Sequence, residues 1–382
     1  MGNAAHNSAF GQQCLAGRAH GRRHDPFTAK LLRISWEFLL RIYPGRKRMV
    51  WKRNGWYLSV DTKMNNLFSV TGPTPCSCNE RSRKLFRKNN ISINDLMQVI
   101  LIRPNGMENL NELLPSFQIT DLKALVKDLK SSGITSIKLF AGEHKGHKTI
   151  DRAISSENNL INAIRELKSL YPELFIAVET CLCSYTESGS CGIFSEKGSL
   201  LIEDTLEVFK EMAVLQAVAG ADALGPAAMI KGTISACRDA LDSQGLTHIS
   251  IMPHLIFSSP FYRGYRKTMG IHSERLEDYR SALHADPYDY RVSAKLALDM
   301  VSEGADSILA EPALFILDQI RIIRNEVNVP IGCFSVSGEY YILSSDITDK
   351  DHTAQIEFCR AAKRSGSDFI ATYAAIEIAR HI

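Results

Sequence analysis

The sequence predicts an α/β protein, a (β/α)₈ TIM barrel preceded by an N-terminal arm or tail. From about residue 95, short β-branched runs alternate with longer amphipathic stretches, the pattern of repeated βα units on a parallel sheet. Eight such units over about 285 residues match the size of one barrel, although a doubly wound open sheet also fits the alternation. The predicted strands are Gln98–Ile102, Ser136–Phe140, Phe175–Glu179, Ala223–Gly225, His248–Met252, Ser307–Ala310, Pro330–Phe334 and Asp368–Thr372.

Helices are predicted between these strands, for example over Ile119–Lys130, Leu201–Ala219 and Ser293–Glu303. Three glycines stand where a helix should stop before the next strand: Gly220, Gly304 and Gly366. Glycine favours the left-handed conformation that ends many helices, so these positions mark helix-to-strand turns.

Residues 1–75 form a separate basic extension, and the barrel is predicted over residues 76–382. Within the extension, only Leu31–Tyr43 has an amphipathic helical pattern. Two interpretations fit this segment. It is an arm used for oligomerisation, or it is a poorly ordered or mis-started tail, with Met64 as the true first residue.

The composition indicates a soluble globular protein. The 382 residues are 45% hydrophobic and 23% charged, and the formal net charge is only +3. This balance gives no support for nucleic-acid or membrane partners, and no apolar run reaches the roughly 18 residues of a membrane span. Nine cysteines without a secretion signal indicate the reducing cytoplasm, where clustered thiols bind metal more often than they pair.

Three cysteines follow the third predicted strand on one loop. Cys181 and Cys183 are separated by one residue, and Cys191 returns after a turn that contains Gly189. Three thiolates that leave a fourth tetrahedral position open are typical of a catalytic zinc site. Ordinary free thiols remain the alternative on spacing alone, and that interpretation is preferred for the other cysteines.

Several motifs in the same order resemble the porphobilinogen synthase (5-aminolevulinate dehydratase) family over residues 80–382. They are Cys181-Leu182-Cys183-x-Tyr185-Thr186 with Gly189-x-Cys191-Gly192, Phe261-Tyr262 leading to Arg266, Val336-Ser337-Gly338-Glu339-Tyr340, and Thr372-Tyr373. The chain therefore resembles this family. The resemblance favours the barrel over the open sheet.

The resemblance implies a reaction and a set of binding residues. The family condenses two 5-aminolevulinate molecules into porphobilinogen, using lysine imines and zinc. It implies that Cys181, Cys183 and Cys191 hold zinc. It also implies that the protein is a homo-oligomer. Two substrate molecules each carry a carboxylate. Ser337 and Tyr373 are expected to bind one of these carboxylates, and Arg266 with Arg275 is expected to bind the other.

The chain departs from the family where the imine-forming lysines are expected. Glu311 stands at the place of the principal lysine, and the stretch Pro253–Pro260 contains no lysine for the second. Ala227–Ala228 and Lys231 also replace the polar and acidic residues expected after strand four. A carboxylate cannot form an imine, so ordinary porphobilinogen synthesis is not expected.

Three functions stay open. The first is a diverged zinc lyase or condensing enzyme without lysine imines, in which His254 and Glu311 provide acid–base catalysis. The second is a non-catalytic paralogue that binds the ligand or forms hetero-oligomers with an active synthase. The third is a true synthase of tetrapyrrole biosynthesis with an unrecognised lysine, for which Lys231 is the candidate.

Overall fold

The computed structural model describes residues 47–52, 55–60, 80–86, 90–104, 114–143, 148–271, 283–346 and 348–382. The chain divides into two compact units, Met1–Phe86 and Arg87–Ile382. In the first unit, β1 (Lys47–Lys52) pairs antiparallel with β2 (Gly55–Val60), and α2 covers Glu80–Phe86. The predicted helix Leu31–Tyr43 lies outside the described residues.

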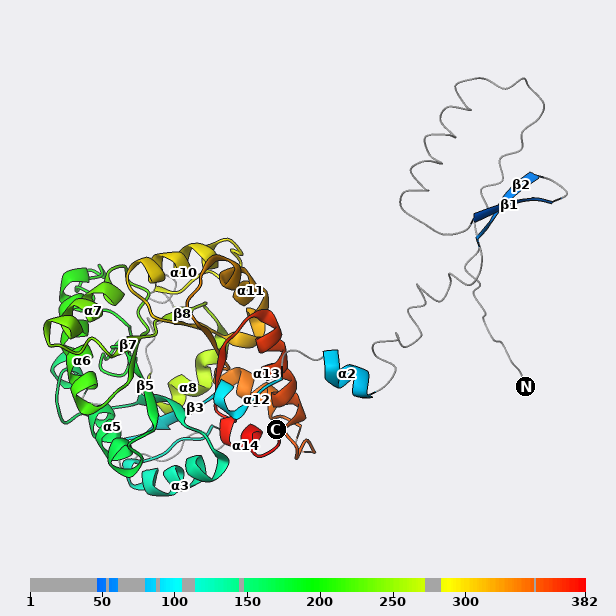
Figure 1. The fold of residues 1–382 in the computed structure, drawn as a ribbon. Coiled ribbons are helices and arrows are strands. Elements are labelled where there is room, and N and C mark those ends of the chain that lie inside the picture. The colour runs from blue at the N-terminus through cyan, green and yellow to red at the C-terminus, as the bar shows by residue number, and fades with distance from the viewer. Residues whose placement is uncertain are drawn as a thin grey trace, which may run out of the picture. The chain divides into compact units, whose positions relative to one another are not determined.

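The second unit contains a curled parallel sheet at its centre with helices in a ring around it (Figure 1). Its strands are β3 (Leu96–Ile102), β4 (Ser136–Ala141), β5 (Phe175–Thr180), β6 (Ala223–Pro226), β7 (Ser250–Ile251), β8 (His254–Ile256), β9 (Ile308–Glu311), β10 (Ile331–Phe334) and β11 (Phe369–Thr372). The strand order is β7-β6-β5-β4-β3-β11-β10-β9-β8. The predicted barrel is therefore confirmed.

The two ends of this order, β7 and β8, are halves of one interrupted strand. Only Met252 and Pro253 separate them. The Met252 N–H donates to Leu224 O of β6 at 2.7 Å, and Leu309 N of β9 donates to Pro253 O at 2.9 Å. The backbone thus bridges β6 and β9 and closes the ring. The predicted strand His248–Met252 covers β7 but not β8, and Pro253, which has no backbone N–H to donate, lies at the interruption between them.

The described α-helices of the second unit are α3 (Leu122–Ser132), α4 (Ile150–Ala153), α5 (Asn159–Leu170), α6 (Ile202–Ala219), α7 (Thr233–Ser243), α8 (Arg263–Thr268), α10 (Val292–Ser302), α11 (Leu317–Glu326), α12 (Ser337–Leu343), α13 (Thr353–Ser365) and α14 (Ala375–Ala379). Short 3₁₀ turns cover Ile93–Asp95, Ile119–Asp121, Pro260–Tyr262 and Ala313–Phe315. None of the described helices is long and apolar enough to cross a membrane.

Amphipathic spacing explains how these helices pack. In α3, the side chains of Leu122, Leu125, Val126 and Leu129 are all buried, at the spacing of one helix face. The three predicted glycine stops are confirmed by left-handed φ angles of 115°, 101° and 116° at Gly220, Gly304 and Gly366.

The barrel has two hydrophobic clusters, one between the sheet and the surrounding helices and one in the interior enclosed by the strands. In β4, Ile137 and Leu139 belong to the outer cluster between strands and helices, and Phe140 belongs to the inner cluster. Side chains of a strand alternate between its faces, so Lys138 points to the barrel interior together with Phe140. A charged residue therefore occupies an inward position beneath the carboxyl ends of the strands.

Candidate active site

A pocket of about 750 Å³, counting its open mouth, lies at the carboxyl ends of the barrel strands. Phe140 of β4, Glu179 of β5, Glu311 of β9 and Phe334 of β10 line it, together with Tyr373 just after β11. Most of the remaining lining is apolar or aromatic, so the few polar groups decide what the pocket can bind.

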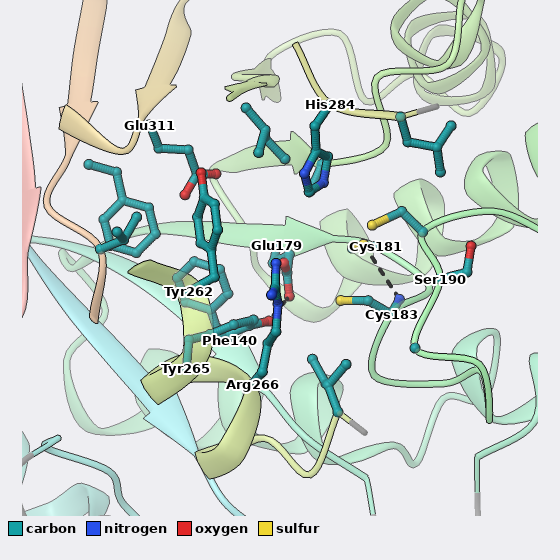
Figure 2. A pocket seen from close by; sticks show the side chains of 18 of the residues that line it. Phe140, Glu179, Cys181, Cys183, Ser190, Tyr262, Tyr265, Arg266, His284 and Glu311 are labelled. Atoms are coloured by element: carbon teal, nitrogen blue, oxygen red, sulfur yellow. Dashed lines mark hydrogen bonds between the residues drawn. The ribbon is translucent and has the colours of Figure 1, made fainter. Parts of the chain in front are cut away.

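The three predicted cysteines meet at one side of this pocket (Figure 2). The sulfur atoms of Cys181, Cys183 and Cys191 all lie within 4.8 Å of one another, and all three residues line the pocket. The Cys183 N–H points to Cys181 Sγ at 3.5 Å, which holds the start of the loop in place. The turn before Cys191 uses Gly189, whose φ is 64°.

The chemistry of this donor set fits a soft divalent cation. Hydrogen bonds that the Cys181 thiol makes to Cys183 and Cys191, with burial, raise the pKa of Cys181 well above its usual value. Three thiolates this close repel one another unless a cation lies between them. Three sulfur ligands facing a pocket suit zinc with one open position.

Glu311 and His254 form a buried pair on the opposite side of the barrel interior. His254 Nδ1 and Glu311 Oε1 lie 2.7 Å apart in a hydrogen bond, and the two residues are 1% and 4% exposed. Burial, then Glu179, raises the pKa of Glu311 well above its usual value. Burial, then Lys138, lowers the pKa of His254 well below its usual value. His254 begins β8 and does not line the pocket; Glu311 does.

No lysine lines this pocket among the described residues. Ile256 ends β8 and lines the pocket, and it belongs to the stretch Pro253–Pro260 in which the resemblance implies a second lysine. Lys231, the candidate substitute, is exposed and is not part of the lining.

Sequence reasoning missed Lys138. Its side chain is fully buried, and its Nζ donates to Val178 O at 2.8 Å. Burial lowers the pKa of Lys138 to about 7, against the opposing influence of Glu179, Glu311 and Cys181. The sequence signal was a single lysine inside the otherwise apolar predicted strand Ser136–Phe140. Alternate residues of a strand point to the same face, so Lys138 lies on the same face as Phe140.

The residues expected to bind carboxylates are only partly brought together. Arg266 lines the pocket, with its guanidinium 5.3 Å from the ring centre of Tyr262. Tyr373 also lines it, and its buried hydroxyl has no hydrogen-bond partner among the described residues. Ser337 is not in the lining: its hydroxyl donates to Phe261 O and accepts from Tyr265 N, both at 3.0 Å. Arg275 lies outside the described residues.

Glu179 completes the polar lining beside the cysteines. The Tyr265 hydroxyl donates to Glu179 Oε2 at 3.0 Å, and Tyr265 comes from α8, the helix that carries Arg266. Figure 2 shows the Arg266 side chain reaching from that helix into the space between the cysteine loop and Glu311. The described lining therefore offers the guanidinium of Arg266, the imidazole of His284, two carboxyl groups and a cluster of thiols to a small polar ligand.

Comparison with known proteins identifies similar chains. A profile of the family described as delta-aminolevulinic acid dehydratase matches residues 75–381. The delta-aminolevulinic acid dehydratase of Halalkalibacterium halodurans is 32% identical over 309 residues, covering 78% of this chain and 92% of that protein. The Escherichia coli protein of the same name is 30% identical over 306 residues, with 78% and 93% covered.

A solved structure agrees with these sequence comparisons. It is the delta-aminolevulinic acid dehydratase (porphobilinogen synthase) of Toxoplasma gondii ME49, in complex with the reaction product porphobilinogen. It matches with a TM-score of 0.75 and 25% sequence identity, over 87% of this chain and 95% of that one.

Proposed function

Because the chain belongs to the delta-aminolevulinic acid dehydratase family, we propose that its pocket binds a 5-aminolevulinate-like amino-keto acid beside a zinc ion. We further propose that it acts on this ligand by acid–base chemistry of Glu311 and His254, without a lysine imine. The observation that carries the proposal is the position of Glu311, which lines the pocket with His254 Nδ1 2.7 Å from its carboxyl oxygen.

Zinc would be held by Cys181, Cys183 and Cys191, whose sulfur atoms already lie within 4.8 Å of one another. When bound, it would supply Lewis-acid polarisation of a ligand oxygen. The open side of the thiol cluster faces the pocket, so a ligand can approach the metal from there.

Arg266 and Tyr373 support the binding of a carboxylate. A guanidinium can grip a carboxylate with two charge-assisted hydrogen bonds. The unpartnered buried hydroxyl of Tyr373 can donate a further one. Ser337 would contribute indirectly, because its bonds to Phe261 O and Tyr265 N position the segment that carries Arg266.

Glu311 would exchange protons with the ligand. Burial raises the pKa of Glu311 well above its usual value, which favours the protonated carboxyl that a general acid needs. His254 would orient this carboxyl through its Nδ1 and accept or return the proton. Arg275, in the segment after α8, would grip the second carboxylate as the family resemblance implies.

A second candidate function is favoured by the absence of lysine from the described pocket lining. In it, the protein binds the amino-keto acid without turnover or assembles with an active homologue. Both candidates include self-association and a reducing, cytoplasmic location, which suits a cluster of free thiols.

One experiment separates the two candidates. Purified zinc-loaded protein is incubated with 5-aminolevulinate, and all products are identified by mass spectrometry. Any product other than porphobilinogen that disappears in Glu311→Gln supports the acid–base enzyme. Binding of 5-aminolevulinate by calorimetry without any product supports the binding-only paralogue.

A further inference from the structure

We infer that Lys138, His254 and Glu311 form a buried proton relay between the barrel interior and the pocket. This inference deepens the proposed acid–base function and rests on it for its role in turnover, but the geometry of the three residues stands by itself. Glu311 is the outer end of the relay, because it lines the pocket. Lys138 is the inner end, because its side chain is fully buried.

The three side chains come from three strands and converge on one point. His254 of β8 bonds Glu311 of β9 through Nδ1 at 2.7 Å. Its other nitrogen, Nε2, is buried and has no hydrogen-bond partner among the described residues. A β-carbon built on Gly225 of β6 would lie 3.0 Å from this Nε2 and 2.2 Å from Lys138 Nζ. The two nitrogens therefore share the space that glycine leaves free.

This arrangement allows two coupled proton transfers that leave the total number of protons on the three side chains unchanged. In one state Lys138 is an ammonium, His254 carries its hydrogen on Nδ1, and Glu311 is a carboxylate. Lys138 Nζ, which donates to Val178 O in this structure, turns toward the unpartnered His254 Nε2 and gives it a proton, while Nδ1 gives its proton to Glu311 Oε1. The products are a neutral amine, the other imidazole tautomer and a carboxylic acid. No imidazolium ion forms, and the reverse shift restores the first state.

Burial and the surrounding charges shift the pKa of each group in the relay. Burial lowers the pKa of Lys138 to about 7, so its ammonium and amine forms are both accessible. The groups that raise this pKa are Glu179 on β5, Glu311 on β9 and Cys181 after β5. Glu311 in turn faces Glu179, Lys138, Glu339 and Arg266. His254, with its pKa lowered by burial and Lys138, stays uncharged in between.

Lys138 is placed as a charge partner and proton donor rather than as a nucleophile. Phe140, the next inward residue on β4, lines the pocket, whereas Lys138 does not. Lys138 Nζ reaches the level of Gly225, the register partner of Glu179, but the lysine is not part of the described pocket lining.

The test measures the protonation of Glu311 directly and needs no substrate. Infrared spectra of the zinc-loaded protein are recorded across pH, and subtraction of the Glu311→Gln spectrum isolates the carboxyl band. Lys138→Met removes the nearby positive charge, and we expect it to shift the Glu311 titration upward by about one pH unit or more. Lys148→Met is the matched control, because Lys148 is a mostly buried lysine whose Nζ donates to Gly270 O instead.

A second measurement follows the middle of the relay. In protein with ¹⁵N-labelled histidine, the His254 signals should shift from a mixture of tautomers toward a single one in Lys138→Met. A Glu311 titration that is the same in Lys138→Met and the unaltered protein would overturn the relay. So would a borohydride-trapped adduct of 5-aminolevulinate on Lys138, which would make it a nucleophile. Failure to bind 5-aminolevulinate would contradict the proposed function while leaving both spectroscopic results in place.

Discussion

Ile256 and Glu311 are direct partners in the parallel register of β8 and β9, and both line the pocket. These neighbouring strand ends are the places where the family resemblance leads one to expect two imine-forming lysines. An isoleucine and a glutamate cannot form imines, so the chemistry at these two positions differs from covalent capture of a ketone.

With 5-aminolevulinate and zinc, we therefore expect little or no porphobilinogen in a colorimetric pyrrole assay. Loss of covalent catalysis removes many orders of magnitude from a rate. Turnover comparable to that of an ordinary synthase would contradict the prediction that the protein forms no lysine imine. Lys231→Ala and Lys138→Ala would then locate the amine responsible.

A lysine introduced at position 311 should allow an imine to be trapped with borohydride, but it should not give turnover. Glu311→Lys places an amine at the pocket lining, so borohydride with 5-aminolevulinate should give a stable adduct detectable by mass. Turnover should stay low because Ala228, Lys231 and Ile256 are unchanged. Glu326→Lys is the control, since it adds a lysine at an exposed position on α11. If Glu311→Lys binds ligand yet gives no adduct, position 311 does not present its side chain to the ligand.

Close to one zinc per chain should be found by metal analysis of the purified protein. The triple variant Cys181→Ala, Cys183→Ala, Cys191→Ala should lose it, because tetrahedral zinc needs these thiolates. Cys237→Ala, which removes a buried thiol elsewhere in the barrel, should keep it. Retention of zinc by the triple variant would refute the assignment.

Levulinate or 5-aminolevulinate should bind through Arg266. Calorimetry should show that Arg266→Ala weakens binding by roughly 1.5–3 kcal/mol, the range for a hydrogen bond to a charged group. Tyr373→Phe should also weaken binding, by roughly 1.5 kcal/mol, the lower end of that range, because it removes one donor to the charged carboxylate. Arg263→Ala is the matched control, because Arg263 lies on the same helix but is exposed and outside the pocket lining. Equal losses for Arg263→Ala and Arg266→Ala would exclude a specific role for Arg266.

The stability of the protein should fall as pH rises above the usual carboxyl range, in part because of Glu311. Its pKa is raised in the folded chain, so between the unfolded and folded values only the folded state keeps the proton. Under this linkage, the free energy of unfolding decreases with pH in that window. Denaturant titrations from pH 4 to 8 should show a shallower decrease in Glu311→Gln than in the exposed control Glu326→Gln. An identical slope in both variants would show that Glu311 ionises equally in the folded and unfolded chains.

Much of the fold could be predicted from local sequence patterns. Eight strands in order, the helices between them and the stops at Gly220, Gly304 and Gly366 follow from periodicity and from the preference of glycine for positive φ. The gathering of Cys181, Cys183 and Cys191 was also predictable, because one short loop carries all three. The predicted strand His248–Met252 lacks the half that forms β8, because Pro253 interrupts the local strand pattern.

Only the tertiary structure decided which polar groups meet. His254 and Glu311 are 57 residues apart in the sequence, and their contact exists because closing the barrel sets β8 beside β9. Ser337 is a residue type that can bind a ligand, but its hydroxyl is already hydrogen-bonded to the backbone of Phe261 and Tyr265. Lys138 stands in the sequence as a single charge in an apolar strand. Strand alternation can indicate its inward direction, but the space at Gly225 depends on the register of strands around the whole ring, which no local pattern encodes.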